Sequence, residues 1–169
     1  MKLLKIKIKN FRGYNEQVDF SVGDLTTIVG KNDIGKSSIL EVLDIFFNKG
    51  KGTIKMDKDD VNKNCLSQNN NETEITVTFD EYPDKIIIDS TNETSLGAEY
   101  LLNVEDQLEI VKRYNNGGSE KVFIKAHHPS NENCSDLLLK KQKDLQSIIK
   151  VNGIDCDNKT RNAVMRAAI

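Results

Sequence analysis

The chain has 169 residues, of which 37% are hydrophobic and 30% are charged, and its net charge is −2 at pH 7. This length and composition suit one ordinary domain, or a core with a small appendage, that carries a polar surface. A chain that wraps nucleic acid is usually basic, so any DNA contact here must be local or supplied by another segment.

The sequence contains no membrane or secretion signal that we recognise. No stretch reaches the roughly 18 apolar residues that a membrane span needs, and lysines interrupt the apolar residues of the N-terminus. The cysteines Cys65, Cys134 and Cys156 are odd in number and form no C-x-x-C pair. This pattern is typical of reduced thiols, so we expect a cytoplasmic protein without membrane partners.

The first segments predict strands separated by a turn. Residues 4–9 alternate apolar and charged side chains, which is the period of a half-buried strand. Residues 10–13 form a turn, and residues 17–20 alternate again. Residues 24–29 end in a β-branched run, which favours a buried strand.

Helix, loop, sheet and helices are expected in that order after residue 36. Apolar residues at helical spacing predict a helix over 37–47, and the polar, asparagine-rich stretch 55–71 predicts a loop. Two further helices are expected over 137–151 and 160–169. Between loop and helices, alternating segments predict an antiparallel sheet of hairpins, with strands over 73–79, 85–89, 99–104, 107–114 and 121–125.

Residues 30–37 are Gly-Lys-Asn-Asp-Ile-Gly-Lys-Ser and fit the phosphate-binding Walker A pattern G-x-x-x-x-G-K-S/T. The glycines allow the loop to turn its N–H groups toward phosphate oxygens, and the following helix adds a positive dipole end. Lys36 supplies an ammonium for the β- and γ-phosphates, and the Ser37 hydroxyl ligates Mg²⁺. We therefore expect a Mg-nucleotide site with Lys36 as its catalytic residue. A glycine loop that binds nothing is the alternative, and the expected strand and helix on its two sides disfavour it.

Residues 6–13 and 25–38 together resemble the start of the ABC-type ATPases of the SMC, RecF and OLD (overcoming lysogenization defect) superfamily. Asn32 is the usual third residue of the loop in that superfamily. Asp33 replaces the glycine common in SMC and RecF members, so the loop is most similar to that of OLD-type ATPases. The resemblance implies an α/β fold, namely the N-terminal lobe of an ABC-type P-loop NTPase with an inserted antiparallel β-lobe, followed by a helical segment.

The same resemblance implies a division of the chain. The ATPase lobe is expected over 1–126, with a Walker A core over 1–48, a loop over 49–72 and the antiparallel sheet over 73–126. Residues 127–169 are expected to form helices at the root of the superfamily's coiled-coil arm, or alternatively a DNA-binding helix–extended–helix module of the SAP type.

The implied cofactors are ATP and Mg²⁺. Arg12 would be a second nucleotide contact, because the turn formed by Asn10, Phe11 and Arg12 (the N-F-R turn) lies near the nucleotide in the superfamily. A solvated turn arginine is the alternative. The N–H of Ser38 is expected at the α-phosphate. The full set of expected nucleotide contacts is Arg12, Gly30, Lys31, Asn32, Asp33, Ile34, Gly35, Lys36, Ser37 and Ser38, with Ser37 as the metal ligand.

Other parts of a complete ATPase are not found in the sequence. Walker B requires Asp-Glu after four apolar residues, and the nearest imitation, 85–90, has serine in place of the glutamate. We find no signature motif and nothing that matches a Toprim nuclease. The acidic cluster 57–60 and the pair His127–His128 are expected to be structural or exposed rather than metal sites.

The resemblance implies a DNA-associated ATPase, acting in DNA repair or as an OLD-type antiphage nuclease. ATP held between two heads would drive formation of a homodimer or higher oligomer, with DNA and a nuclease or effector as further partners. The chain stops inside a helical pattern, so we expect a piece of a longer protein that has no turnover alone. A nucleotide-binding regulatory subunit without turnover is the alternative. A small P-loop kinase or GTPase is disfavoured because 62–65 lacks the aspartate of N-K-x-D.

Overall fold

The structure is a computed structural model, and it describes residues 1–31, 35–48, 51–88 and 93–169. The chain divides into two compact units. The first consists of Met1–Asp80 and Glu109–Ile124, and the second of Glu81–Leu108 and Lys125–Ile169. The expected division at residue 126 stays a prediction.

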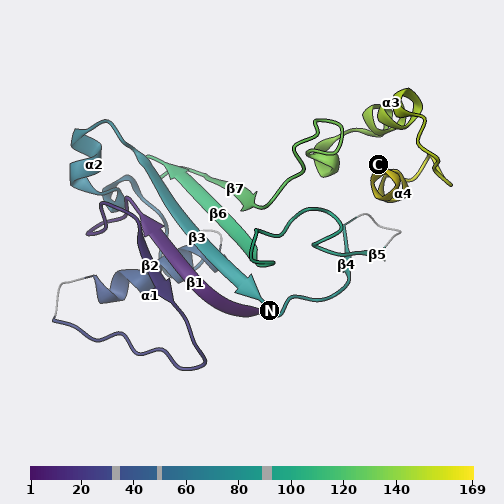
Figure 1. Cartoon of the computed structure of the whole chain (residues 1–169). Helices are drawn as coiled ribbons and strands as arrows, with labels where there is room; N and C mark the ends of the chain where they lie inside the picture. Colours follow the sequence, from purple (N-terminus) through teal and green to yellow (C-terminus); the bar gives the residue numbers. More distant parts are fainter. Residues whose placement is uncertain (32–34, 49–50, 89–92) are drawn as a thin grey trace. The chain divides into compact units, whose positions relative to one another are not determined.

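The first unit is built on a five-stranded sheet in the order β2-β1-β3-β6-β7. Strand β1 runs antiparallel to both β2 and β3, and the arrows of β3, β6 and β7 alternate in direction (Figure 1). The expected strands near residues 4, 17, 73, 107 and 121 are therefore confirmed, within one antiparallel sheet that begins at the N-terminus. Their bounds are β1 Lys2–Lys9, β2 Val18–Ser21, β3 Glu72–Asp80, β6 Leu108–Asn115 and β7 Glu120–Lys125.

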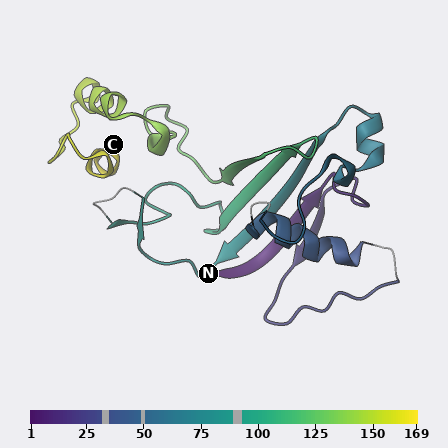
Figure 2. The same cartoon turned by 180° about the vertical axis from the view of Figure 1, so that it is seen from behind.

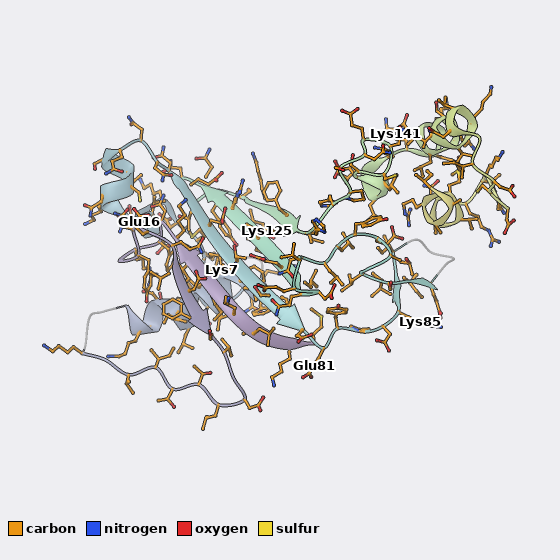
Figure 3. All side chains as sticks on the ribbon, viewed as in Figure 1. Lys7, Glu16, Glu81, Lys85, Lys125 and Lys141 are labelled. Carbon is orange, nitrogen blue, oxygen red and sulfur yellow. The ribbon has the colours of Figure 1, made fainter. Side chains whose placement is uncertain are left out.

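The two faces of this sheet differ in chemistry. Ile6 pairs with Val77 across β1 and β3, and both side chains are buried on the face that packs against a helix. Neighbouring residues of a strand point to opposite faces, so Lys7 lies on the other face (Figure 3), where it pairs with Glu109 at 2.7 Å. The alternation of apolar and charged residues in β1 reflects these two surroundings.

Helix α1 (Lys36–Asn48) covers the apolar face of the sheet. It lies behind the sheet in Figure 1 and in front of it in the reverse view of Figure 2. The Phe47 ring of α1 contacts the Phe79 ring of β3 edge to face, with 6.1 Å between the ring centroids. The helix forms where its period predicts it, although two of the apolar residues behind that prediction, Leu40 and Phe47, are exposed. The buried side chains of the helix are Ser38, Ile39, Val42, Ile45 and Phe46.

The C-terminal end of α1 is tied to the sheet by a buried lysine. The Lys112 ammonium of β6 donates to the carbonyl oxygen of Phe46 at 2.7 Å and pairs with Glu120 of β7 at 2.6 Å. It also lies 5.0 Å from the centroid of the Phe46 ring. A cation at the last turn of a helix interacts favourably with the exposed carbonyls and the helix dipole.

The buried strand expected over 24–29 is wrong for the structure described. The segment has no strand pairing, and Leu25 and Val29 are 90% and 82% exposed. A β-branched run becomes a strand only when a neighbour supplies its hydrogen bonds. Strand β2 is the last strand at this edge of the sheet, and no described strand runs beside the segment.

Two other expectations fail because local hydrogen bonds compete with the pattern. The stretch 55–71 contains the 3-10 helix η1 (Lys58–Asp60) and helix α2 (Lys63–Ser67), which are capped by the Asp57 and Asn62 side chains. The strand expected over 99–104 is a turn, in which Leu101 donates its N–H to the carbonyl of Leu96 at 2.9 Å.

The second unit holds a two-stranded antiparallel sheet of β4 (Ile86–Ile87) and β5 (Glu93–Thr94), together with the C-terminal helices. These helices, expected from the sequence, are confirmed with shorter bounds: η2 Leu137–Leu139, α3 Gln142–Asn152 and α4 Asn162–Ala168. They share a core of Leu137, Leu145, Ile149 and Met165. No helix in the described part of the chain is long and apolar enough to cross a membrane.

Candidate nucleotide-binding site

The Walker A residues lie where the chain enters α1. Gly30 and Lys31 precede the helix, and Gly35 comes directly before its first residue, Lys36. Asn32, Asp33 and Ile34 lie outside the described residues, so their expected contacts stay predictions. Gly35 has φ +85°, a left-handed conformation that side chains with a Cβ rarely adopt. The helix after it supplies first-turn N–H groups without partners four residues back, which suits an anion.

The Lys36 side chain bends back over the loop. Its ammonium donates to the carbonyl oxygens of Gly30 at 2.5 Å and of Lys31 at 2.6 Å. An ammonium has three N–H donors, so it can hold these carbonyls and still donate to a phosphate oxygen. No ion pair joins Lys36 to a carboxylate among the described residues.

The two serines after Lys36 differ in exposure. Ser37 is exposed, so its hydroxyl is accessible to a metal ion, whereas Ser38 is buried. The N–H of Ser38 donates to the carbonyl oxygen of Gly35 at 3.1 Å. The donors present, one ammonium, one open hydroxyl and a helix N-terminus, fit a nucleotide phosphate with Mg²⁺.

Arg12 contacts carboxylates rather than lying free in solvent. Its Nε donates to Asp60 of η1 at 2.7 Å, its Nη1 pairs with Glu41 of α1, and its guanidinium lies 5.1 Å from the centroid of the Phe11 ring. Its backbone N–H also donates to the carbonyl of Asp60 at 2.6 Å. Arg12 therefore joins the N-F-R turn to α1 and η1, and its role as a nucleotide contact stays a prediction.

Asn10, the first residue of the same turn, is fully buried and carries a hydrogen-bond network. Its amide donates to the carbonyls of Asn70 and Glu72 at 3.0 Å each, and its side-chain oxygen accepts the N–H of Asn62 at 3.1 Å. The Thr73 hydroxyl donates to its carbonyl at 2.7 Å. Asn10 has φ +53°, and asparagine is enriched in this conformation, so the sequence carried a signal that an interpretation as a plain turn missed.

The side chain of Tyr14 also meets the loop. Its hydroxyl donates to the carbonyl oxygen of Gly35 at 3.0 Å. Neither this contact nor the pairing of Arg12 with Glu41 and Asp60 could be found from the sequence, because each joins residues that only the fold brings together.

The other candidate metal sites are accounted for by local structure. Asp57 caps η1, and Asp60 binds Arg12. Within the described residues, no group of three His, Cys, Asp or Glu side chains could hold a metal ion. His127 and His128 are exposed. Of the Walker B imitation, Ile86 and Ile87 form the short strand β4, and Asp89 lies outside the described residues.

Two curated relatives come from Methanocaldococcus jannaschii. The uncharacterized protein MJECL44 is 30% identical over 117 residues, which are 66% of this chain and 31% of that protein. The uncharacterized protein MJECL10 is 47% identical over 47 residues, which are 28% of this chain and 22% of that protein. The chain thus spans less than a third of the length of these relatives.

Solved structures with a similar fold are SMC ATPases. One, from work on the ATP-driven dimerization and DNA-stimulated activation of SMC ATPases, has a TM-score of 0.51 and 18% identity, and the match covers 89% of this chain and 92% of that one. An SMC head bound to the C-terminal winged-helix domain of ScpA has a TM-score of 0.50 and 15% identity, covering 98% and 54%. At these identities the likeness shows the fold, a mixed α/β arrangement with an antiparallel sheet like the N-terminal part of SMC heads.

Family membership rests on a match that runs almost the whole length of the chain. Residues 1–167 match the AAA ATPase domain family AAA_15, and they include the loop, the turn and α1 described above. The chain therefore belongs to the AAA ATPase domain family AAA_15, as an ATP-binding part with an SMC-head-like fold.

Proposed function

We propose that this chain is the phosphate-binding N-terminal part of a DNA-associated ATPase of the OLD type, which acts in DNA repair or antiphage defence and whose heads dimerise around ATP. The observation that carries the proposal is the Lys36 ammonium, held by loop carbonyls at the mouth of α1 beside the left-handed Gly35. The printed description of one similar structure, ATP-driven dimerization of SMC ATPases, supports the dimer.

In this proposal the chain binds and orients the triphosphate. The loop amides and the N-terminus of α1 would hold the phosphates, Lys36 would donate to the β- and γ-phosphates, and the exposed Ser37 hydroxyl would be a ligand of Mg²⁺. The metal ion, when bound, neutralises charge on the phosphates. A water-orienting carboxylate is not identified here, and the greater length of the curated relatives supports placing it elsewhere in the protein.

Arg12 is the proposed second nucleotide contact. Its Nε and Nη1 bind Asp60 and Glu41, and its side chain is 34% exposed. A guanidinium has five N–H donors, so those not taken by the two carboxylates are available for a phosphate oxygen. The paired carboxylates would hold the guanidinium in place for this contact.

The direct test is calorimetry of MgATP binding to the complete polypeptide, with Lys36→Ala as the variant. A charge-assisted hydrogen bond contributes about 1.5–3 kcal/mol, so we expect affinity to fall about 10- to 100-fold. The matched control is Lys63→Ala, because Lys63, which is exposed, is likewise a lysine at the first position of a helix, α2. Equal affinity of wild type and Lys36→Ala would refute the proposal.

A regulatory subunit without turnover is the second candidate, because no Walker B carboxylate pair is found among the described residues. Phosphate release by the complete polypeptide separates the two. Steady release that Lys36→Ala abolishes excludes the regulatory subunit, whereas MgATP binding without release favours it. Light scattering with and without MgATP then shows whether the nucleotide drives dimerisation.

A further inference from the structure

The side chain of Tyr14 contacts Gly35, the glycine directly before the first residue of α1. Its hydroxyl donates to the carbonyl oxygen of Gly35 at 3.0 Å. A Cβ built on Gly35 would lie 3.1 Å from that hydroxyl oxygen and 3.3 Å from the Cζ atom of the ring. The ring therefore packs closely against Gly35, and a residue with a Cβ at this position would have to displace the ring by a few tenths of an ångström.

Planar peptide geometry extends this contact to Lys36. The carbonyl of Gly35 and the N–H of Lys36 belong to one trans peptide, in which C=O and N–H point in opposite directions. A donor that fixes the direction of the Gly35 carbonyl also fixes the direction of the Lys36 N–H. This N–H belongs to the first turn of α1, whose amides are the donors of a helix-terminus anion site.

The position of Tyr14 is itself well determined. Its backbone exchanges two hydrogen bonds with Phe11, at 2.8 and 2.9 Å, and its ring meets Phe20 of β2 edge to face at 5.8 Å. Burial raises the pKa of the Tyr14 hydroxyl above its ordinary value of 10.0. The hydroxyl therefore stays protonated, and remains a donor, throughout the neutral range.

We propose that Tyr14 is a positioning residue of the nucleotide site: its hydrogen bond to Gly35 aims the Lys36 amide at the phosphates. Tyr14 itself contacts no nucleotide in this account. The inference rests on the proposed function, because it assigns a role only if the loop binds a nucleotide phosphate. It explains why a tyrosine hydroxyl in the β1–β2 turn reaches a backbone carbonyl 21 residues later.

The test compares nucleotide affinities of the complete polypeptide with Tyr14→Phe, which removes the hydroxyl and keeps the ring. One neutral hydrogen bond contributes about 0.5–1.5 kcal/mol, so MgATP and MgADP should bind about 3- to 10-fold more weakly. AMP lacks the β- and γ-phosphates and should compete as well as before. The matched control is Tyr82→Phe, because the Tyr82 hydroxyl likewise donates to a backbone carbonyl, that of Asp106, at 2.9 Å.

Four outcomes separate the possibilities. A loss confined to MgATP and MgADP in Tyr14→Phe supports the inference, whereas an equal loss for AMP would show a purely structural role and overturn it. Unchanged affinities in Tyr14→Phe, with binding lost in Lys36→Ala, overturn the inference and leave the proposed function standing. No nucleotide binding by the wild type overturns both. If Tyr14→Phe does not fold, Phe20→Leu loosens the same ring, and the same di- and triphosphate selectivity decides.

Discussion

Gly35 meets two separate constraints, one from its own backbone and one from Tyr14. Its φ of +85° is costly for any residue with a Cβ, and an added methyl group would lie 3.1 Å from the Tyr14 hydroxyl. We expect Gly35→Ala to lower the free energy of unfolding by about 1–3 kcal/mol and to weaken MgATP binding. Urea unfolding and calorimetry measure the two effects.

Gly13→Ala is the matched control for Gly35→Ala. Gly13 lies in the same turn as Tyr14, has no left-handed φ, and an added Cβ there would meet no atom within 4 Å. Its variant should change stability by less than about 0.5 kcal/mol. If both alanine variants unfold at the same urea concentration, the account of Gly35 is wrong.

The N-F-R turn and the phosphate loop show which features of single residues could be predicted from the sequence. The sequence predicted a turn, and the pattern around Gly30 and Lys36 predicted the phosphate loop. The asparagine at position 10 hinted at a left-handed turn, but the hydrogen-bond partners of Asn10 and the two carboxylates at Arg12 could not be predicted, because they lie 29 to 63 residues away. Periodicity carries no information on such pairings.

At the scale of elements, α1 is held to its surroundings at both ends. Gly35 and Glu41 bind the turn after β1, and the Phe46 carbonyl binds Lys112 of β6. The Lys112 side chain is 6% exposed. Lys112→Met keeps the apolar stem, but it loses a charge-assisted hydrogen bond and leaves Glu120 without its lysine. We expect a loss of about 2–3 kcal/mol in the free energy of unfolding.

Urea unfolding of Lys112→Met, Lys121→Met and a double variant tests this expectation. Lys121 is an exposed neighbour on β7, so its variant should be near neutral. Adding Glu120→Gln to Lys112→Met removes the unpaired carboxylate and should recover part of the loss. A double variant less stable than Lys112→Met would contradict the pairing.

Tyr114 of β6, whose hydroxyl contacts Glu120 of β7, should make the protein less stable at alkaline pH. Burial, followed by the negative charge and hydrogen bond of Glu120, raises the pKa of Tyr114 far above its ordinary value of 10.0. The unfolded chain therefore releases this proton at a lower pH than the folded chain does. The contribution of Tyr114 is fully present below pH 10 and is lost as the pH rises beyond it.

Unfolding free energies of wild type and Tyr114→Phe, measured from pH 8 to about pH 11, test the sign. The fall above pH 10 should be shallower in the variant, because phenylalanine has no proton to release. Parallel curves would show that other groups cause the fall.

Elements were predictable where one local pattern had no competitor. Strands β1, β3 and β6 and helix α1 each show a clear period and bury apolar side chains. Strand β7 also forms where its period predicts it, but it leaves Val122, Phe123 and Ile124 exposed. The segment 99–104 was expected to be a strand, but its backbone forms hydrogen bonds within a turn instead. Propensity alone therefore did not determine the outcome in that segment.

At the scale of the whole molecule, each compact unit contains at least one ion pair between residues that lie far apart in the sequence. In the second unit, Arg166 of α4 binds Glu99 through two hydrogen bonds, at 2.9 and 3.0 Å, and their side chains are 5% and 6% exposed. Removing one partner of such a buried pair costs about 3–5 kcal/mol. Glu99→Gln should therefore destabilise α4 and the turn that carries Glu99.

Hydrogen exchange locates this loss. Protection should fall in the second unit and remain in β1 and β3 of the first, because each unit has its own contacts. Loss of protection spread evenly over both units would mean that they unfold together.

The strand order β2-β1-β3-β6-β7 could not be predicted from the sequence. Alternation predicts that a segment is a strand, but it does not say which strand lies beside it. The N-terminal strands were expected apart from the later sheet, yet β1 pairs with β3 from Lys2 to Lys9. That pairing depends on the match between Ile6, Ile8 and the apolar residues of β3.

The unpaired segment ahead of the phosphate loop has a practical consequence. From Leu25 to Val29 the chain has no charge, proline or glycine, and four of its five residues are β-branched. Its two end residues are almost fully exposed. Short stretches of this kind template strand addition between identical molecules. A concentrated preparation of these 169 residues should therefore self-associate through this stretch, and Ile28→Lys should keep it dispersed, which light scattering at rising concentration measures.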